Sequence, residues 1–381
     1  MLITSSYPNV ADGSEAAGSF VADLVQILST KIPVRVVAPG TDNRIERIHA
    51  NLDVYRFKAP NTPLSNLQRY SPWGLWQIFT VLAAGKKCTL AAMESGNVVH
   101  ILALWALPCG YWARLASRLY RVPYSVWTLG SDIWSLGKVP IVRQVLAQVL
   151  RGASKCYSDG YQLRQDTQEI ANRKVDFLPS TRIIELLRPK ALSASPPYRL
   201  VFIGRWHINK GPDLLLQALI LLDESTWQRI ARVDIYGGGP LQPLLETELK
   251  TLTNGRRPVF LAGFLDKMAA QEVLQHADYL LLPSRVESIP VVFSDAMKMH
   301  CPVIANPVGD LKALVQDGPV GCVAASATAE AFSKAISIAM QSSPQNYEAA
   351  LHAMAAKFSL QDSIAPRLIS ELGLIVDGTR E

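Results

Sequence analysis

The stretch at residues 283–310, PSRVESIPVVFSDAMKMHCPVIANPVGD, decides the fold, because it joins a strand end, a turn, a helix start and a further strand. The apolar run YLLLP at 279–283 predicts a short buried strand, and the polar residues 284–289 predict a turn. Pro290 is well placed as the first residue of a helix that runs to about Met299. Strand, turn and helix in this order are typical of a parallel α/β sheet.

The helix start at Pro290 predicts an anion site. Free backbone N–H groups and the positive helix end would face a phosphate or a polar sugar above Ser288, Ile289 and Pro290. Glu287 and Asp295 flank this turn, so both can reach one ligand only if that ligand is extended. Two such acids, taken alone, are usually a solvated Glu and a surface Asp. Their meaning therefore depends on the rest of the chain.

Length and composition favour two globular domains, since the chain has 381 residues of which 49% are hydrophobic. No apolar run reaches the ~20 residues of a membrane-spanning helix. The opening MLITSSYP lacks the pattern of a signal peptide, so the protein is expected in the cytosol. The five cysteines are scattered without a CxxC pair, which indicates neither a disulfide framework nor a zinc site.

Basic and aromatic residues concentrate in the first half. Residues 1–190 carry 22 Lys/Arg against 13 Asp/Glu, whereas residues 191–381 carry 16 against 19, and six of the eight Trp lie between Trp73 and Trp134. The segment SPWGLWQIFTVLAAGKK at 71–87 predicts an amphipathic helix that could enter a lipid headgroup layer. This pattern suits a protein that binds peripherally to an anionic membrane surface, and not one that binds nucleic acid. The alternative is core aromatics beneath a solvated basic face.

Short apolar runs alternate with helical patterns in both halves, which predicts two doubly wound, parallel-sheet, Rossmann-like α/β domains. The segment PKALSASPP at 189–197 has the small residues and prolines of a linker. We therefore predict one domain at 1–190 and a second at 191–358.

Strand ends in the first half supply candidate binding residues. Gly18 opens the first helix, where the backbone can approach a ligand closely. His100 is expected at the end of the strand NVVHIL, and the loop GSDIW begins at Gly130 after the strand YSVWTL. Because ligands gather at the carboxyl ends of parallel strands, His100, Ser131 and Asp132 are expected to share one rim. The alternative for His100 is a hydrogen-bonded structural histidine.

The loop GRWHINKG at 204–211 places Arg205 and Lys210 between a strand end and a helix start. Two cations there suit a diphosphate, because each charge-assisted bond is worth about 1.5–3 kcal/mol. Such residues are usually solvated, but glycines also end the neighbouring strands, at 237–239 and at Gly263. The sequence has no Asp-x-Asp and no His/Cys cluster with ligand spacing. We therefore expect protein cations and helix dipoles, not a metal ion, to neutralise the diphosphate.

The motifs GRWHINKG, YGGGP, AGF, ESIP with Asp295, and CPVIANPVGD resemble, in this order and spacing, the donor domain of retaining glycosyltransferases of the GT-B fold, family 4 (group 1). The loop ending in Gly18, the VVH strand, GSDIW, SDGY and the C-terminal helix also match, so the resemblance covers almost the whole chain. It implies two Rossmann-like domains that face a central cleft, with the C-terminal helix, about 359–381, packed back on the first domain.

The resemblance also implies roles for individual residues. Arg205 and Lys210 would hold the diphosphate, Glu287 the hydroxyls of the transferred sugar, and Asp295 the ribose. Gly263 and Phe264 would border the base. The implied donor-binding set is Gly18, Gly204, Gly263, Phe264, Ser288, Ile289, Pro290, Val291, Val292 and Asp295, the catalytic set is Glu287, Arg205 and Lys210, and the acceptor-side set is His100, Ser131 and Asp132.

Three positions depart from the family pattern. Asp295 stands where the family usually has a Glu, and its side chain is one methylene shorter. The family's paired glycines are here Ala17 and Gly18. Leu129 stands where a His commonly precedes the Gly-Ser-Asp turn, so no role for a histidine there can be carried over.

The resemblance therefore implies a retaining, metal-independent glycosyltransferase without a cofactor. It would move a sugar from a UDP- or GDP-sugar to an acceptor hydroxyl, such as a lipid-linked saccharide or a cell-envelope polysaccharide precursor. Two alternatives are a nucleotide-sugar epimerase of the same architecture and a non-catalytic subunit that binds the donor without turnover. A dinucleotide-dependent oxidoreductase is disfavoured, because no G-x-G-x-x-G follows the first strand.

Overall fold

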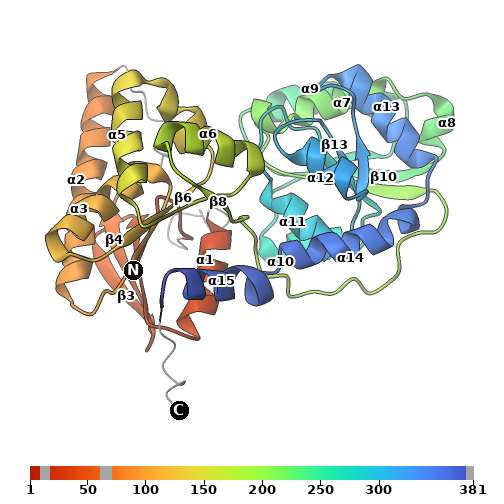
Figure 1. Ribbon diagram of the computed structural model, residues 1–381. Coiled ribbons are helices and arrows are strands. Elements are labelled where there is room, and N and C mark those ends of the chain that lie inside the picture. The colour runs from red at the N-terminus through yellow and green to blue at the C-terminus, as the bar shows by residue number, and fades with distance from the viewer. Residues whose placement is uncertain (9–17, 61–70, 375–381) are drawn as a thin grey trace, which may run out of the picture. The chain divides into compact units, whose positions relative to one another are not determined.

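The structure is a computed structural model that describes residues 1–8, 18–60 and 71–374. The chain divides into two compact units, one formed by Met1–Pro179 with Ile364–Glu381 and the other by Ser180–Ser363. Each unit has its own sheet and its own apolar core (Figure 1). This confirms the predicted class of two doubly wound α/β domains.

The sheet of the first unit has eight strands among the described residues, in the order β3-β4-β2-β1-β5-β6-β7-β8. Neighbours pair in parallel except β3 and β4, which are antiparallel. The edge strand β3 was not predicted, because its sequence RIERIH has only two apolar residues, three positions apart, and so shows neither an apolar run nor the alternation of a strand. The strands are β1 (Leu2–Ile3), β2 (Val34–Gly40), β3 (Arg44–His49), β4 (Leu52–Lys58), β5 (Ile101–Leu104), β6 (Tyr124–Thr128), β7 (Lys155–Ser158) and β8 (Asp176–Phe177).

Helices cover both faces of this first sheet. Helices α2, α3, α5 and α6 lie on one face, and α1 lies on the other, where it packs against α15 (Figure 1). The C-terminal α15 is tied to the unit by Arg367, which donates to the carbonyl of Phe177 at 2.7 Å. The helices are α1 (Ser19–Ser29), α2 (Pro72–Glu94), α3 (Tyr111–Tyr120), α4 (Ser131–Trp134), α5 (Pro140–Gly152), α6 (Tyr161–Ala171) and α15 (Ala365–Glu371).

The second unit has a six-stranded sheet among the described residues, ordered β11-β10-β9-β12-β13-β14, and all its pairs are parallel. Its strands are β9 (Tyr198–Ile203), β10 (Ile230–Tyr236), β11 (Val259–Ala262), β12 (Tyr279–Leu282), β13 (Val303–Ala305) and β14 (Gly321–Val323). Its helices are α7 (Pro212–Ile220), α8 (Glu224–Trp227), α9 (Gln242–Asn254), α10 (Lys267–Leu274), α11 (Val291–Lys298), α12 (Leu311–Asp317), α13 (Ala329–Met340) and α14 (Glu348–Lys357).

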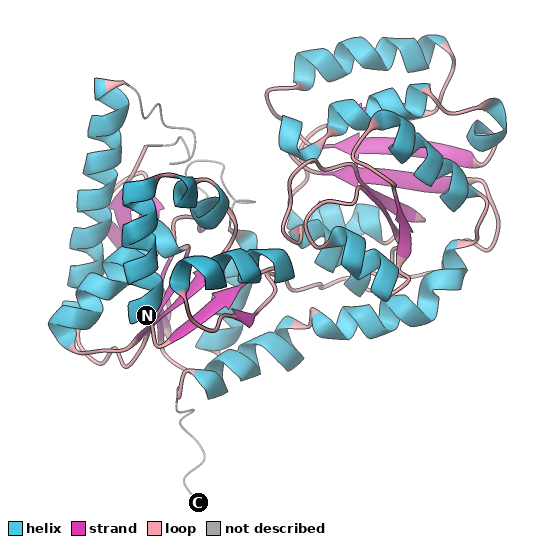
Figure 2. Cartoon of the chain, turned by 45° about the horizontal axis from the view of Figure 1, so that its top comes forward, coloured by secondary structure: helices cyan, strands magenta, loops and turns pink. Residues whose placement is uncertain are grey.

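The strand order of the second sheet creates a switch point between β9 and β12. From β9 the chain moves outward through β10 to β11, and from β12 it moves the opposite way through β13 to β14. Helices α7, α9 and α13 therefore pack together on one face, and α11 packs with α14 on the other (Figure 2). At such a switch point the loops after the two central strands diverge, which leaves a place for a ligand at their carboxyl ends.

The observed division of the chain differs from the predicted boundaries at 190/191 and 358/359. The segment after Pro179 belongs to the second unit because it is hydrogen-bonded to α10 and to the end of α11. The amide of Glu185 donates to the side chain of Gln271 at 2.8 Å, and Arg188 donates to the carbonyl of Met299 at 2.8 Å. The linker-like composition at 189–197 therefore does not mark the start of the second unit.

No helix in the described ranges is both long enough and apolar enough to span a lipid bilayer.

Candidate functional site

Two loops meet at the switch point of the second sheet, the loop 204–211 after β9 and the turn 283–290 after β12. Gly211 joins them. It has a φ of 66°, and a Cβ on it would lie 2.2 Å from the carbonyl oxygen of Pro283, so only glycine allows this approach. The predicted diphosphate loop and the predicted sugar turn are therefore neighbours at the edge of the sheet.

Lys210 and Glu287 form an ion pair across these two loops. The Glu287 side chain is 10% exposed and that of Lys210 is 35% exposed, so the pair is accessible mainly from the lysine side. The hydroxyl of Ser284 also donates to the Glu287 carboxylate, at 3.1 Å. Both residues were predicted as catalytic from the sequence, and the structure brings them into direct contact.

Arg285 fixes the turn that carries Glu287. Its guanidinium makes two bonds of 2.8 Å to the carboxylate of Asp213, at the start of α7, and a third of 2.9 Å to the carbonyl of Ile208. The amide of Arg285 donates to the carbonyl of Asn209 at 2.8 Å. Bidentate pairing of this kind orients both partners, so it holds the sugar turn in register with the diphosphate loop.

A third loop, which follows β13, closes the turn from the other side. Gly309 has a φ of 51°, and a Cβ there would lie 2.1 Å from the carbonyl oxygen of Glu287. The side-chain amide of Asn306 donates to the carbonyls of Pro283 at 2.9 Å and Ser284 at 3.2 Å. The main chain on both sides of Glu287 is thus constrained by residues far along the chain.

The helix after the turn begins one residue later than expected. Pro290 is the residue before α11, with a φ of −65° and a ψ of 137°, and the helix runs from Val291 to Lys298. No side chain caps this helix start within the described residues. The amides of Val291 and Val292 and the positive end of the helix dipole lie beside the Glu287 turn, which supports the predicted anion site.

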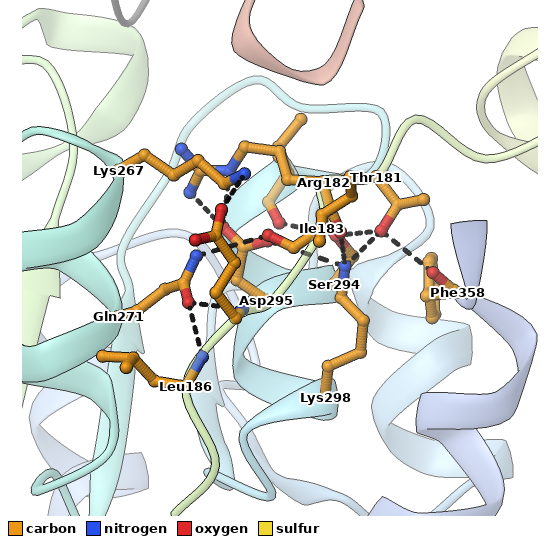
Figure 3. Close-up of polar contacts among 12 residues, drawn as sticks. Thr181, Arg182, Ile183, Leu186, Lys267, Gln271, Ser294, Asp295, Lys298 and Phe358 are labelled. Atoms are coloured by element: carbon orange, nitrogen blue, oxygen red, sulfur yellow. Dashed lines mark hydrogen bonds and ion pairs between the residues drawn. The ribbon is translucent and has the colours of Figure 1, made fainter. Parts of the chain in front are cut away.

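Asp295, which the resemblance implies as a ligand of the ribose, is buried in the second unit. Its side chain is 1% exposed and forms an ion pair with Arg182, whose Nε donates at 2.9 Å (Figure 3). Lys298, one turn further along α11, lies 3.8 Å from the other carboxylate oxygen and also bonds the hydroxyl of Thr181. The carboxylate therefore links α11 to residues 181–182, and its contact with a ribose stays a prediction.

The remaining predicted donor-binding residues lie at the same edge of the sheet. Gly204 and Arg205 follow β9, and the exposed Arg205 side chain makes no hydrogen bond or ion pair with any described residue. Gly263 and Phe264 follow β11, where a Cβ on Gly263 would meet nothing within 4 Å and Phe264 is 63% exposed. These residues have room for the predicted contacts with the diphosphate and the base, and the contacts stay predictions.

Besides Oδ1 of Asp295, which has only the ion pair with Lys298, two buried polar atoms at this edge have no hydrogen-bond partner among the described residues, Nε1 of Trp206 and Oδ1 of Asn306. Trp206 is 4% exposed and Asn306 is fully buried. An unpaired buried polar atom needs an explanation, and a ligand or water at the site would supply one. Neither residue was singled out from the sequence, although each follows the end of an apolar strand closely, which is the signal that could have found them.

The acceptor-side prediction rests on the first unit, where Asp132 is buried in α4. Its carboxylate is 1% exposed and accepts hydrogen bonds from the amide of Ala106 at 2.7 Å and from that of Leu129 at 3.4 Å. Burial raises the pKa of Asp132 to about 6. The carboxylate thus ties the loop after β6 to the chain after β5. Ser131 beside it is exposed.

The prediction that His100 shares a rim with Ser131 and Asp132 is wrong. His100 precedes β5, so it lies at the amino end of the strands, whereas Asp132 follows the carboxyl end of β6. Its Nε2 is 3.0 Å from the hydroxyl of Ser125, the second residue of β6, and the side chain is 6% exposed. Burial lowers the pKa of His100 to about 4. These contacts fit the alternative of a structural histidine.

Gly18 directly precedes α1 with a φ of 76°, and a Cβ on it would lie 2.3 Å from the carbonyl oxygen of Ser6. The close approach seen here is therefore to the chain itself, and a donor contact stays a prediction. Ala17 and the other residues at 9–17 lie outside the described part. Within the described ranges, no group of three or more His, Cys, Asp or Glu side chains could hold a metal ion. Metal independence stays a prediction.

The second unit matches a known protein family. Residues 197–342 match the family model described as glycosyl transferases group 1. This confirms the resemblance to group 1 glycosyltransferases for the part of the chain that carries β9 to β14, whereas family 4 and the retaining mechanism stay predictions.

Individual relatives are similar over different lengths. An α-D-kanosaminyltransferase of Streptomyces kanamyceticus is 28% identical over 124 residues, which is 32% of this chain and 31% of that protein. An N-acetyl-α-D-glucosaminyl L-malate synthase of Bacillus anthracis is 23% identical over 328 residues, 83% of this chain and 81% of that one. The matching stretch thus spans about a third of the length of several curated relatives.

Two solved structures share the fold over nearly the whole chain. A sucrose-phosphate synthase of Thermosynechococcus elongatus has a TM-score of 0.75 at 18% identity, with 97% of this chain and 98% of that one covered. HepE of Anabaena, solved in complex with UDP-glucose, has a TM-score of 0.68 at 15% identity, with 97% and 99% covered. The fold is that of the GT-B glycosyltransferases.

Proposed function

Because residues 197–342 form a group 1 glycosyltransferase domain, we propose that this chain is a glycosyltransferase that moves a sugar from a UDP- or GDP-sugar to an acceptor hydroxyl. The observation that carries the proposal is the ion pair of Lys210 with Glu287 beside the uncapped start of α11. The likeness to a fold solved with UDP-glucose supports the class of donor.

A nucleotide sugar offers each member of this ion pair a partner. The diphosphate carries negative charge for Lys210, and the sugar carries hydroxyls that can donate to the Glu287 carboxylate. Donor binding would therefore exchange one ion pair for charge-assisted hydrogen bonds of both residues with the ligand. Before the donor binds, the ion pair holds both charged side chains in the site. Without Lys210, Glu287 would be a buried charge with no partner, which would destabilise the protein.

The proposed reaction is a same-face displacement with retention of anomeric configuration. The bond from the anomeric carbon to the phosphate oxygen breaks, the acceptor oxygen bonds to that carbon from the same face, and the departing phosphate takes the acceptor proton. Negative charge grows on the diphosphate as it leaves, so Arg205, Lys210 and the amides at the start of α11 would stabilise the transition state more than the ground state. The proposal requires no metal ion.

We place the acceptor at an anionic membrane surface because the exposed side chains of α2 suit a helix by which the protein would bind peripherally to such a surface. Its first turns expose Trp73, Trp76 and Phe79 at 65%, 55% and 70%, and the two indole rings stack with centroids 5.0 Å apart. Lys86 and Lys87 are exposed further along the same helix. Exposed aromatics followed by cations are typical of a helix that lies in a lipid interface.

The charge of the surrounding segment agrees with this placement. Residues 71–152, which include α2, α3 and α5, contain eight Lys/Arg and two Asp/Glu, and one of those acids, Asp132, is buried. Anionic headgroups attract such a surface. A lipid-linked saccharide or an envelope polysaccharide precursor would present its hydroxyl there.

The test is product analysis with purified protein, UDP- and GDP-sugars, and membrane extracts as a source of acceptor. We expect acceptor-dependent release of UDP or GDP and a glycosidic bond with the anomeric configuration of the donor. Altered free sugar nucleotide without transfer would favour the epimerase, and donor binding without any turnover would favour a binding subunit. Inversion at the anomeric carbon would overturn the same-face step.

A further inference from the structure

A cavity lies in the first unit, and none of the residues assigned to catalysis lines it. It opens between α3 and α5 at the end of the sheet where Tyr124 begins β6, and its volume is about 400 Å³. Three arginines line it, Arg114 and Arg118 from α3 and Arg151 from α5, together with the polar side chains of Ser117 and Gln148. No Asp or Glu is among its lining residues.

The arginines of α3 are not neutralised by the protein. Arg114 and Arg118 lie one helical turn apart, and neither side chain makes a hydrogen bond or an ion pair with the described residues. Like charges at this spacing destabilise a helix. The Nε of Arg151 already donates to the carbonyl of Ala171 at 3.1 Å. An anion held by Arg114, Arg118 and the remaining nitrogens of Arg151 would remove that repulsion.

Helix dipoles explain only part of this cluster. Arg118 lies in the last turn of α3 and Arg151 in the last turn of α5, where a cation interacts favourably with the helix end. Arg114 is the fourth residue of α3, in the half where a cation is disfavoured, and yet it is half-buried. The dipole therefore does not explain its position.

The cavity depends on a glycine. Gly152 ends α5, and a Cβ there would lie 2.7 Å from the hydroxyl oxygen of Tyr124 and 3.7 Å from Nε of Arg114. That hydroxyl is fixed by a hydrogen bond of 2.6 Å to the carbonyl of Val149. A larger residue at 152 would therefore clash with the Tyr124 hydroxyl, which borders the cavity.

We propose that this cavity binds a phosphate ester. Arginine donates in a planar fork that matches phosphate oxygens, and the Ser117 hydroxyl and the Gln148 amide can complete the set of donors. The volume exceeds that of one phosphate, so the cavity has room for an organic substituent on it. It is either a soluble phosphorylated compound or the headgroup of an anionic lipid, since α3 packs against α2.

The experiment compares three full-length proteins, the wild type, the pocket variant Arg114→Gln/Arg118→Gln, and the control Lys250→Gln/Lys334→Gln in the second unit. The control removes the same charge from exposed positions outside the cavity. Binding is measured with inorganic phosphate by calorimetry, and with phosphatidylcholine vesicles with and without phosphatidylglycerol by sedimentation. Phosphate bound at the proposed donor site is common to all three proteins and cancels in the comparison. Circular dichroism and thermal unfolding show that each variant is folded.

We expect the pocket variant to bind phosphate about tenfold more weakly than the wild type, equivalent to ~1.4 kcal/mol, and the control to stay close to the wild type. A loss seen only with phosphatidylglycerol vesicles supports a lipid headgroup as the ligand, and a loss seen with inorganic phosphate supports a soluble ester. Equal behaviour of pocket variant and control with both probes overturns the proposal. Donor turnover is measured separately, so failure of the proposed function leaves this test intact.

Discussion

Lys210 and Glu287, 77 residues apart in the sequence, are ion-paired at the switch point of the second sheet. Each had been assigned a separate part of the donor, the diphosphate for Lys210 and the sugar for Glu287. Their contact shows that the two assignments concern one site. It also makes their contributions interdependent, because removal of either residue leaves the other charge without its partner.

Substitution of either residue is expected to reduce turnover strongly. Glu287→Gln and Lys210→Met should each lower kcat/KM by more than about tenfold, which is ~1.4 kcal/mol of transition-state stabilisation. The double variant should lose less than the product of the two single losses, because the pair acts as a unit. The matched controls are Glu272→Gln and Lys312→Met, which change exposed residues of the same unit. Turnover within tenfold of the wild type in Glu287→Gln would show that the site is assigned wrongly.

Substitution of Gly309 tests whether the backbone conformation of the turn that carries Glu287 affects turnover when no charged group is changed. Gly309→Ala should destabilise the second unit by at least about 1–2 kcal/mol, because φ is 51° and the Cβ would lie 2.1 Å from the carbonyl oxygen of Glu287. Donor turnover should fall with it as Glu287 is displaced. Gly255→Ala is the control in the same unit, since its φ is −79° and a Cβ there would lie 3.4 Å from the carbonyl oxygen of Leu252, an ordinary contact distance. Equal turnover in the two variants at a temperature where both are folded would contradict the prediction.

Substitution of Asp295 distinguishes two roles of its carboxylate, as a ligand of the ribose and as the buried partner of Arg182. Removal of one member of a buried pair costs about 3–5 kcal/mol, so Asp295→Asn should lower the free energy of unfolding by this order in urea titrations. Asp295→Glu should preserve or improve donor binding if the carboxylate holds the ribose. It should destabilise the protein and weaken donor binding if the site is shaped around Arg182. Calorimetry with UDP or GDP and urea unfolding of the same variants distinguish the two.

The sequence predicted the parts of this site that lie on regular βα units. The apolar run before Pro283 and the proline at 290 indicated strand, turn and helix, and the structure confirms them to within one residue. Arg182 could not be found in this way, because it lies in a segment without periodicity that was expected to belong to the first domain. His100 was placed at the wrong end of its strand, because a uniformly apolar run such as VVHIL does not show where the strand begins.

The buried His100 predicts acid sensitivity of the first unit. Its pKa is about 4 in the folded protein and 6.5 in the unfolded chain, so below pH 6.5 the unfolded chain binds a proton that the folded protein does not. The free energy of unfolding should therefore fall by ~2 kcal/mol between pH 7 and pH 5 on account of this residue alone. His100→Gln should lose that part of the pH dependence while it keeps a polar group near Ser125. Urea unfolding at both pH values measures the difference, and an unchanged slope would contradict the assignment.

The exposed face of α2 predicts salt-dependent binding to anionic membranes. Trp76→Ser/Phe79→Ser should weaken sedimentation with phosphatidylglycerol-containing vesicles by removing side chains that are 55% and 70% exposed and can enter the interface. Lys86→Gln/Lys87→Gln should weaken it at low salt and matter less at high salt, because headgroup attraction is screened over about 10 Å at 0.1 M. Ile338→Ser on α13 is the control, since that residue is 59% exposed in the other unit. Equal binding of the wild type to neutral and anionic vesicles would remove the electrostatic part of the prediction. Unchanged binding of Trp76→Ser/Phe79→Ser would show that α2 is not the docking helix.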